Sequence, residues 1–206
     1  MICKLQIANH ESIDGRMKKH SGMRPQDILV LLTIPAISIG EIAGRKFMFI
    51  PPNNKQIAEL LEISQSEVSE SLARSAYAGL ISNPKLKEIN KLALLDFIKC
   101  GLKYVFPVHP TGIGRGVPTA HSASPLQDEI VSEETFVWEY AEGTTRGLLI
   151  EPLYHTVPAV SLKNEKLYEV FALLDGIRTG KSRVAEISFQ LLKEIINEGW
   201  PITKTL

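Results

Sequence analysis

The sequence has no apolar run long enough to cross a membrane. The longest run, from Ile28 to Ile42, is broken by Pro35 and Gly40 and is shorter than the roughly 20 residues that a transmembrane helix needs. The first residues of the chain carry scattered charges and lack the continuous apolar stretch of a signal peptide. We therefore expect a cytoplasmic protein with no membrane partner.

Cysteine is scarce, with only Cys3 and Cys100 in 206 residues. The two lie in dissimilar surroundings, so no disulfide is expected, in agreement with a reducing compartment. His109, His121 and His155 are irregularly spaced, and no cysteine or paired carboxylate completes a set of metal ligands. We expect neither a metal ion nor a cofactor.

The sequence also has no net charge, because 23 lysines and arginines balance 23 aspartates and glutamates. This balance argues against a protein that coats nucleic acid without regard to sequence. From Arg45 to Val105, however, nine basic residues outnumber six acidic ones, whereas Leu126 to Gly143 contains six acidic residues and no basic one. Positive charge is thus mildly enriched in one part of the chain and negative charge in another.

No acid, base and nucleophile form a pattern typical of an enzyme. The serines next to His121 are not in a Gly-x-Ser-x-Gly elbow. Three glycines surround Arg115 within residues 112–116, but Pro118 prevents the helix that follows a phosphate-binding loop. A cluster of turns is the simpler interpretation, and Arg115 could also contact DNA or the acidic segment. We expect no enzymatic activity and keep Arg115 and His121 as candidates for a ligand or partner loop.

The clearest pattern that the sequence does contain is a helix-turn-helix from Lys55 to Ile81. Asn53 and Gln56 form a capping-box pattern at the start of one helix, and Ser64 and Glu67 repeat it at the start of a second. We expect Glu67 to act as a cap rather than to contact bases. The apolar positions that would face a shared core are Ile57, Ala58, Leu60, Leu61, Val68, Leu72 and Ala76.

The second helix of such a unit lies in the major groove of DNA. The residues on its free face, which we expect to contact bases, are Gln65, Ser66, Ser69 and Glu70. An amide such as Gln65 can pair with adenine, and a carboxylate such as Glu70 can accept from cytosine. The cations expected to contact phosphates, and thereby to fix the register, are Lys55, Arg74, Lys85 and Lys87.

The residues KQIAELLEISQSEVSESLARSAYAGLI resemble the winged helix-turn-helix of MarR-type bacterial transcription regulators, in the patterns IAxxL, ISxSxVS and GLI. The resemblance implies a repressor or activator that binds operator DNA as a homodimer, with its recognition-helix face at the four base-contacting positions named above. Glu62 stands where many such units have glycine, and the expected wing, Ser82 to Lys91, lacks an arginine-rich tip. The segment from Gly101 to Pro158 resembles a bacterial family of small MarR-like proteins, without indicating a mechanism.

The remaining pattern predicts a mainly α chain of the α+β class. We expect a flexible tail at residues 1–24, a winged helix-turn-helix domain at 25–105 and a strand, loop and helical region at 106–206, which would bind an effector or partner or form a dimer. The predicted elements before the middle of the chain are a core helix from Pro25 ended or kinked by Pro35, an extended connector over Gly40–Pro52, a helix over Asn90–Cys100 and a strand over Leu102–Phe106. Those after it are a loop over 108–126, a strand over Thr135–Tyr140 on which a strand over Leu148–Ile150 pairs back, and a hairpin of helices over Leu162–Arg178 and Ser182–Asn197.

Two functional hypotheses follow. The first is a homodimeric, sequence-specific regulator that binds double-stranded DNA and responds to a small-molecule or protein effector. The second keeps the winged-helix scaffold but assigns it to protein binding, as in an adaptor or antitoxin whose acidic Leu126 to Gly143 segment contacts a basic partner.

Overall fold

The computed structural model describes residues 22–37, 51–179 and 182–198. Within these ranges helices predominate and two small sheets accompany them, which confirms the expected α+β class. Most of the predicted tail, the connector over residues 40–50 and Cys3 lie outside the described residues. No described helix combines the length and the apolar character that a membrane crossing requires.

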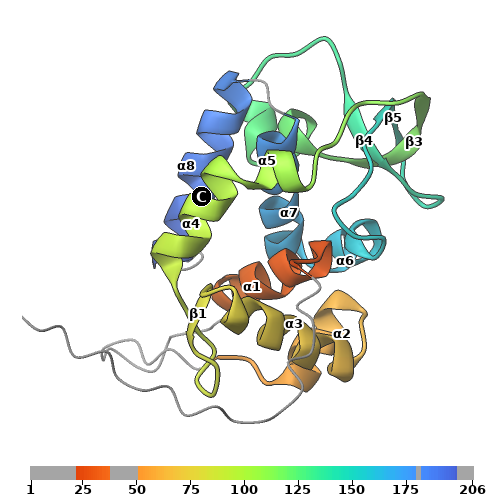
Figure 1. Ribbon diagram of the computed structural model, residues 1–206. Coiled ribbons are helices and arrows are strands. Elements are labelled where there is room, and N and C mark those ends of the chain that lie inside the picture. Colours follow the sequence, from red (N-terminus) through yellow and green to blue (C-terminus); the bar gives the residue numbers. More distant parts are fainter. Residues whose placement is uncertain (1–21, 38–50, 180–181, 199–206) are drawn as a thin grey trace, which may run out of the picture.

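Helix α1 (Pro25–Ile37) is the centre of the fold, as its dense apolar sequence predicts. Every residue from Gln26 to Ala36 is buried. Pro35 neither donates a backbone hydrogen bond nor ends the helix, which continues for two more residues. Figure 1 shows α1 between two groups of helices, with α2 and α3 on one side and α7 on the other.

On one side of α1 lie α2 (Asn54–Leu61), α3 (Gln65–Tyr77) and a hairpin of strands β1 (Ile81–Asn83) and β2 (Glu88–Ile89). The inner residues of the two helices pack against α1 because apolar side chains recur on one face of each. These buried residues include Ile57, Ala58, Leu61, Val68 and Leu72. The helices and their short connection therefore match the prediction from the capping boxes.

The predicted helix over Asn90–Cys100 is confirmed as α4 (Lys91–Cys100), and the structure shows Asn90 as its cap. The next segment is a correction, because Leu102–Phe106 was predicted as a strand and instead forms the short helix α5 (Leu102–Val105). The alternation of large and small side chains was only five residues long. The structure buries Leu102 alone in α5, so helical packing against α7 determines the conformation.

A second sheet is formed by β3 (Ile113–Pro118), β4 (Phe136–Glu139) and β5 (Thr145–Leu149). The three strands form a closed arrangement in which β3 is antiparallel to both of the others and β4 is parallel to β5. The predicted strand over Thr135–Tyr140 is confirmed as β4. The strand predicted over Leu148–Ile150, expected to pair back on it, begins earlier, at Thr145, and pairs with β4 in parallel. The predicted loop over residues 108–126 is wrong where Ile113–Pro118 forms β3.

The glycines that suggested a loop are the reason that β3 can pair so closely. A Cβ atom on Gly116 would lie 1.7 Å from the backbone oxygen of Trp138 on β4. Only glycine leaves room for that neighbouring backbone. The two short 3-10 helices η1 (Ala120–Ser122) and η2 (Leu126–Asp128) follow this strand.

The chain continues into α6 (Val157–Lys163), α7 (Glu165–Arg178) and α8 (Ser182–Glu198). The predicted hairpin of α7 and α8 is confirmed. The first predicted helix, however, is divided at Asn164, whose side chain accepts a hydrogen bond from the backbone of Leu167 and caps α7.

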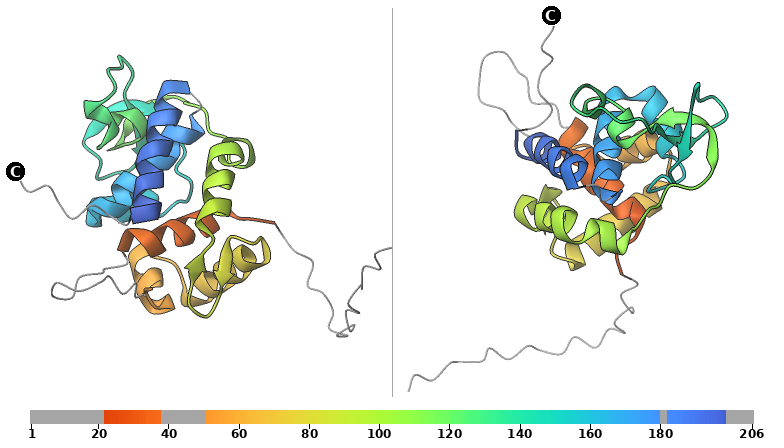
Figure 2. Two further views of the ribbon diagram at one scale, coloured as in Figure 1. Left: turned by 90° about the vertical axis from the view of Figure 1, so that its left-hand side faces the viewer. Right: turned by 90° about the horizontal axis from the view of Figure 1, so that it is seen from above.

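Asp175 on α7 fastens the small sheet to the helices. Its carboxylate is 1% exposed and accepts hydrogen bonds from Trp138 at 2.5 Å, Thr119 at 3.1 Å and Arg178 at 2.6 Å. One hydrophobic cluster includes residues from α1, α3, α4, α7 and α8, and the two views of Figure 2 show these helices packed together. This cluster contains residues from both sides of the predicted domain boundary near residue 105. The division into two domains stays a prediction.

Candidate nucleic-acid interface

The connection between α2 and α3 is short and capped on both sides. The Asn53 side chain accepts from the backbone of Gln56 at 2.9 Å, and the Gln56 side chain accepts from the backbone of Asn53 at 2.8 Å. Glu62 ends α2 in the left-handed region at φ 55°, where many sequences have glycine. The Ser64 hydroxyl then accepts from the backbone of Glu67 at 3.1 Å and begins α3.

Only half of the predicted second capping box is present. The Glu67 carboxylate does not return to its own cap but accepts from Gln26 of α1 at 3.0 Å and from the Tyr154 hydroxyl at 3.1 Å. Burial, together with this hydrogen bond, raises the pKa of the Tyr154 phenol, which therefore remains a donor. Glu67 thus links the first turn of α3 to α1 and to the segment that precedes α6.

Arg74, which the sequence predicted as a phosphate contact, is engaged inside the protein. Its guanidinium donates to Asp27 of α1 at 2.6 Å and 2.9 Å, and the hydrogen bond to this carboxylate raises the pKa of Arg74. The Asp27 side chain is fully buried and the Arg74 side chain is 11% exposed. The prediction is corrected, because a guanidinium held by a buried carboxylate serves to anchor α3.

A third link joins the α2–α3 connection to α6. Lys163, at the end of α6, donates to the carboxylate of Glu62, and this hydrogen bond raises the pKa of the lysine. The helix α3 is therefore fastened through Asp27, through Glu67 and, at the preceding turn, through Lys163. These contacts join segments that are far apart in the sequence, and no local sequence pattern indicates any of them.

The outer face of α3 is open to solvent, as predicted. All four expected base-contacting residues, Gln65, Ser66, Ser69 and Glu70, are exposed. The Ser69 hydroxyl donates to the backbone oxygen of Gln65 and accepts from Asn54, both at 3.0 Å. Glu70 lies 3.5 Å from the outer nitrogen of Arg74. The Gln65 amide has no hydrogen bond to any described residue, so its donors and acceptor are available to a ligand.

The three expected lysines differ in their surroundings. Lys55 is exposed and lies 3.8 Å from Glu59, one turn along α2. Lys85 is exposed at the turn between β1 and β2 and has no ion pair in the described part of the chain. Lys87 donates to the backbone oxygen of Pro52 at 2.5 Å, and burial lowers its pKa. Lys85 and Lys55 can meet phosphates directly, whereas Lys87 has a structural partner.

The β1–β2 hairpin is the element where a wing was expected. Ile81 lies opposite Ile89, and Asn83 opposite Glu88. The Asn83 side chain accepts from the backbone of the two residues that follow Pro84, which fixes the turn. Leu86 at this turn is 60% exposed. The hairpin is short and carries one free cation among its described residues, Lys85.

The charge of the α2, α3 and hairpin surface is close to balanced. From residue 54 to 89 the chain has four basic residues, Lys55, Arg74, Lys85 and Lys87, and five acidic ones, Glu59, Glu62, Glu67, Glu70 and Glu88. Such a surface attracts phosphates weakly. Its short polar side chains and free amide are suited to hydrogen bonding with the edges of bases.

Arg115 lies on β3, far from this surface (Figure 1), and His121 lies in η1, the 3-10 helix that follows β3. Arg115 is exposed on β3, donates to the backbone oxygen of Ala141 at 3.1 Å and lies directly opposite Arg146 on β5. His121 is 3% exposed, bonded to the backbone oxygen of Glu134 at 2.7 Å and packed edge-on against a phenylalanine ring. The two residues therefore do not form one site.

No group of three metal-ligating side chains lies together within the residues that the structure describes. His109 and His155 are exposed at separate places, and Cys100 is an exposed free thiol. The outer face of α3 presents exposed hydrogen-bonding side chains, those of Gln65, Ser66, Ser69 and Glu70. Comparison of the chain with family models, with curated proteins and with solved structures found no match.

Proposed function

We propose that the protein is a sequence-specific regulator that binds double-stranded DNA, with α3 as the recognition helix and the β1–β2 hairpin as a small wing. The order of three helices followed by a hairpin supports this assignment, since a winged helix-turn-helix has this order. α2 would cross the DNA backbone while α3 enters the major groove.

The observation that carries the proposal is an exposed helix face with short polar side chains on a firmly anchored helix. Gln65 and Ser69 lie one turn apart on that face. Beneath it, Asp27 and Gln26 of α1 hold α3 through Arg74 and Glu67. A rigid helix with free hydrogen-bonding groups loses little conformational entropy on binding.

Because basic and acidic residues nearly balance on this surface, attraction to phosphates alone would give little affinity, and a second contribution is required. Two copies related by a twofold axis would place two recognition helices about 34 Å apart, which matches successive major grooves. We therefore propose a homodimer on a site of two similar halves. Its affinity would depend on base contacts more than on phosphate attraction.

Selection of random duplexes by the purified full chain, followed by a mobility-shift assay, tests the proposal. We expect an enriched sequence with two half-sites, and loss of its preference over random DNA in the double variant Gln65→Ala, Ser69→Ala. The matched control is Gln190→Ala on the exposed face of α8, which should bind as the wild type does. No enriched duplex at low salt, or unchanged preference in the double variant, would refute the proposal.

A protein-binding scaffold is the second candidate, favoured by the four exposed carboxylates of the α2, α3 and hairpin surface, Glu59, Glu62, Glu70 and Glu88. The acidic segment from Leu126 to Gly143 would then contact a basic partner. Capture of one specific basic protein, abolished by neutralising Glu133 and Glu134 and accompanied by no DNA preference, would favour this candidate.

A further inference from the structure

Two arginines face each other across the strands β3 and β5. Arg115 lies directly opposite Arg146, and both are exposed. Directly opposite side chains share one face of a sheet, where like charges destabilise the pairing of the strands. The Arg115 guanidinium donates to the backbone oxygen of Ala141 at 3.1 Å, but neither arginine forms an ion pair with a described residue. An anionic group from a partner would relieve this repulsion.

The carboxylates next to the pair in the same sheet do not neutralise it by direct contact. Glu139 on β4 lies opposite Gly116, so it is on the other face of the sheet, because successive residues of a strand alternate. Glu142, in the turn between β4 and β5, helps to raise the pKa of Lys163 and therefore lies near the end of α6. The sheet thus presents two positive charges together on one face.

An exposed apolar side chain lies next to the arginines. Ile113 is two residues before Arg115, so the alternation of the strand places both on the same face. Ile113 is 66% exposed, and its neighbour across the sheet is the half-buried Leu148. We call Ile113, Arg115 and Arg146 the basic face. Its chemistry suits a segment that presents an apolar side chain between carboxylates.

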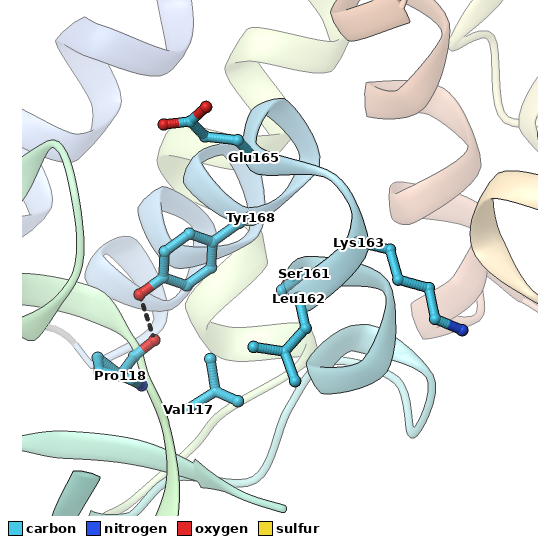
Figure 3. Close-up of a pocket in the computed structure, with 7 residues that line it drawn as sticks. All are labelled: Val117, Pro118, Ser161, Leu162, Lys163, Glu165 and Tyr168. Atoms are coloured by element: carbon cyan, nitrogen blue, oxygen red, sulfur yellow. Dashed lines mark hydrogen bonds between the residues drawn. The ribbon is translucent and has the colours of Figure 1, made fainter. Parts of the chain in front are cut away.

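The strand that carries Ile113 and Arg115 is held firmly by α7. The Tyr168 hydroxyl donates to the backbone oxygen of Pro118, at the end of β3, at 3.0 Å (Figure 3). Burial raises the pKa of this phenol to about 12, so it keeps the proton that it donates. Asp175 of α7 holds β4 in the same way through Trp138. A surface fixed in this way loses little conformational entropy on binding.

A segment with the complementary chemistry is present in the chain itself. Residues 127–134, which we call the acidic loop, have no basic residue, and their four acidic residues are Asp128, Glu129, Glu133 and Glu134. Every residue of the loop except Ile130 is exposed. Val131, between the two pairs of carboxylates, is fully exposed. Asp128, Glu129 and Glu133 form no ion pair with a described cation.

The acidic loop and the basic face lie at the same end of the molecule. The loop leads into β4, and the backbone oxygen of Thr135, the next residue, accepts from the backbone of Leu148 on β5 at 2.8 Å. Figure 1 shows this end of the molecule away from α2 and α3. A twofold axis that passes between the two surfaces would bring the basic face of each copy to the acidic loop of the other, which gives a closed pair.

We propose that two copies of the chain associate through this end of the molecule, with the acidic loop of each copy bound to the basic face of the other. The carboxylates of the loop pair with Arg115 and Arg146, and Val131 packs against Ile113. The inference goes beyond the proposed function, since the association requires no DNA. Its tests contain no DNA, so the failure of one proposal is read separately from the failure of the other.

Analytical ultracentrifugation of the full chain over a range of concentrations measures the association. We expect an equilibrium between monomer and dimer at low salt. The dissociation constant should rise at least about tenfold between about 50 mM and 500 mM sodium chloride, because salt screens ion pairs at an exposed rim. A monomer at every concentration up to about 1 mM, where even a weak complex forms, would overturn the proposal.

Charge reversal locates the interface. The double variant Arg115→Glu, Arg146→Glu places carboxylates opposite the acidic loop, and its dissociation constant should be at least about tenfold higher than that of the wild type. The matched control is Lys55→Glu, Lys193→Glu, which changes the net charge equally at exposed residues of α2 and α8 and should associate as the wild type does. Equal dissociation constants for the two double variants would contradict the assignment.

A mixture of complementary variants gives the sharpest test. Asp128→Arg, Glu133→Arg makes the loop basic, so this variant should also fail to pair with itself. When it is mixed with Arg115→Glu, Arg146→Glu, both contacts of the twofold pair again join opposite charges, and a heterodimer should form with about the affinity of the wild type. Circular dichroism shows that each variant is folded before mixing. Two folded variants that stay monomeric in the mixture would overturn the proposal.

Discussion

The carboxylate of Asp27 on α1 and the guanidinium of Arg74 on α3 are joined by three hydrogen bonds, of 2.6 Å, 2.9 Å and 3.2 Å. The carboxylate has no exposure to solvent, and it also accepts from the backbone of Arg24 at 2.8 Å. One group therefore caps the start of the central helix and anchors the candidate recognition helix.

Arg74→Met should destabilise the protein by about 3–5 kcal/mol, because it leaves the Asp27 carboxylate buried without its charged partner. Urea unfolding followed by circular dichroism measures the change. Lys55→Met is the control, since its ion pair with Glu59 is exposed on both sides and should contribute less than about 0.5 kcal/mol. Similar stability of the two variants would show that the buried pair is not an anchor.

Lys85 and Lys87 should respond differently to substitution, although both lie in or next to the hairpin. Lys85→Ala removes an exposed cation. We expect the plot of the logarithm of the DNA-binding constant against the logarithm of the salt concentration to become less steep by about one, with unchanged stability. Lys87→Ala removes the hydrogen bond to Pro52 and should cost about 1 kcal/mol of stability. Titrations at several salt concentrations, with thermal unfolding of both variants, distinguish these roles.

Elements whose determinants are local could be predicted from the sequence. The caps at Asn53 and Ser64 lie within three residues of the groups they bind, and the helices that follow them are where the pattern placed them. The exposed face of α3 also follows from helical periodicity alone. These features need no knowledge of the rest of the fold.

Features that depend on distant partners could not be predicted in this way. Arg74 looks like a free cation in the sequence, and its partner Asp27 is 47 residues away. Tyr154 and Glu67 are 87 residues apart. An acidic residue in the first turn of an otherwise apolar helix was the available signal for Asp27, since a buried carboxylate requires a partner.

The close pairing of β3 with β4, which the sequence did not indicate, can be tested at Gly116. Gly116→Ala should destabilise the protein by at least about 3 kcal/mol, because the added Cβ would overlap the backbone of Trp138. Gly112→Ala is the matched control, since a Cβ atom added there would meet no other atom within 4 Å and the backbone is not left-handed. A neutral effect of both changes in urea unfolding would contradict the close pairing of β3 with β4.

The half-buried Glu169 on α7 should make the stability of the protein dependent on pH. Burial raises the pKa of its carboxyl group, the hydrogen bond from Ser124 opposes this, and Glu165 adds to it. A raised pKa means that the folded protein binds the proton more tightly than the unfolded chain does. The resulting stabilisation is complete below the pKa of an unfolded glutamate, about 4.3, and is lost as the pH rises through the folded pKa.

Glu169→Gln should remove this loss, because the neutral amide still accepts from Ser124 without carrying a charge. The variant should match the wild type near pH 4 and become progressively more stable than it toward pH 7, as measured by thermal unfolding across this range. Glu129→Gln, at an exposed glutamate, should follow the wild-type profile. A constant difference between Glu169→Gln and the wild type at all pH values would mean that packing, rather than the cost of a buried charge, sets the effect.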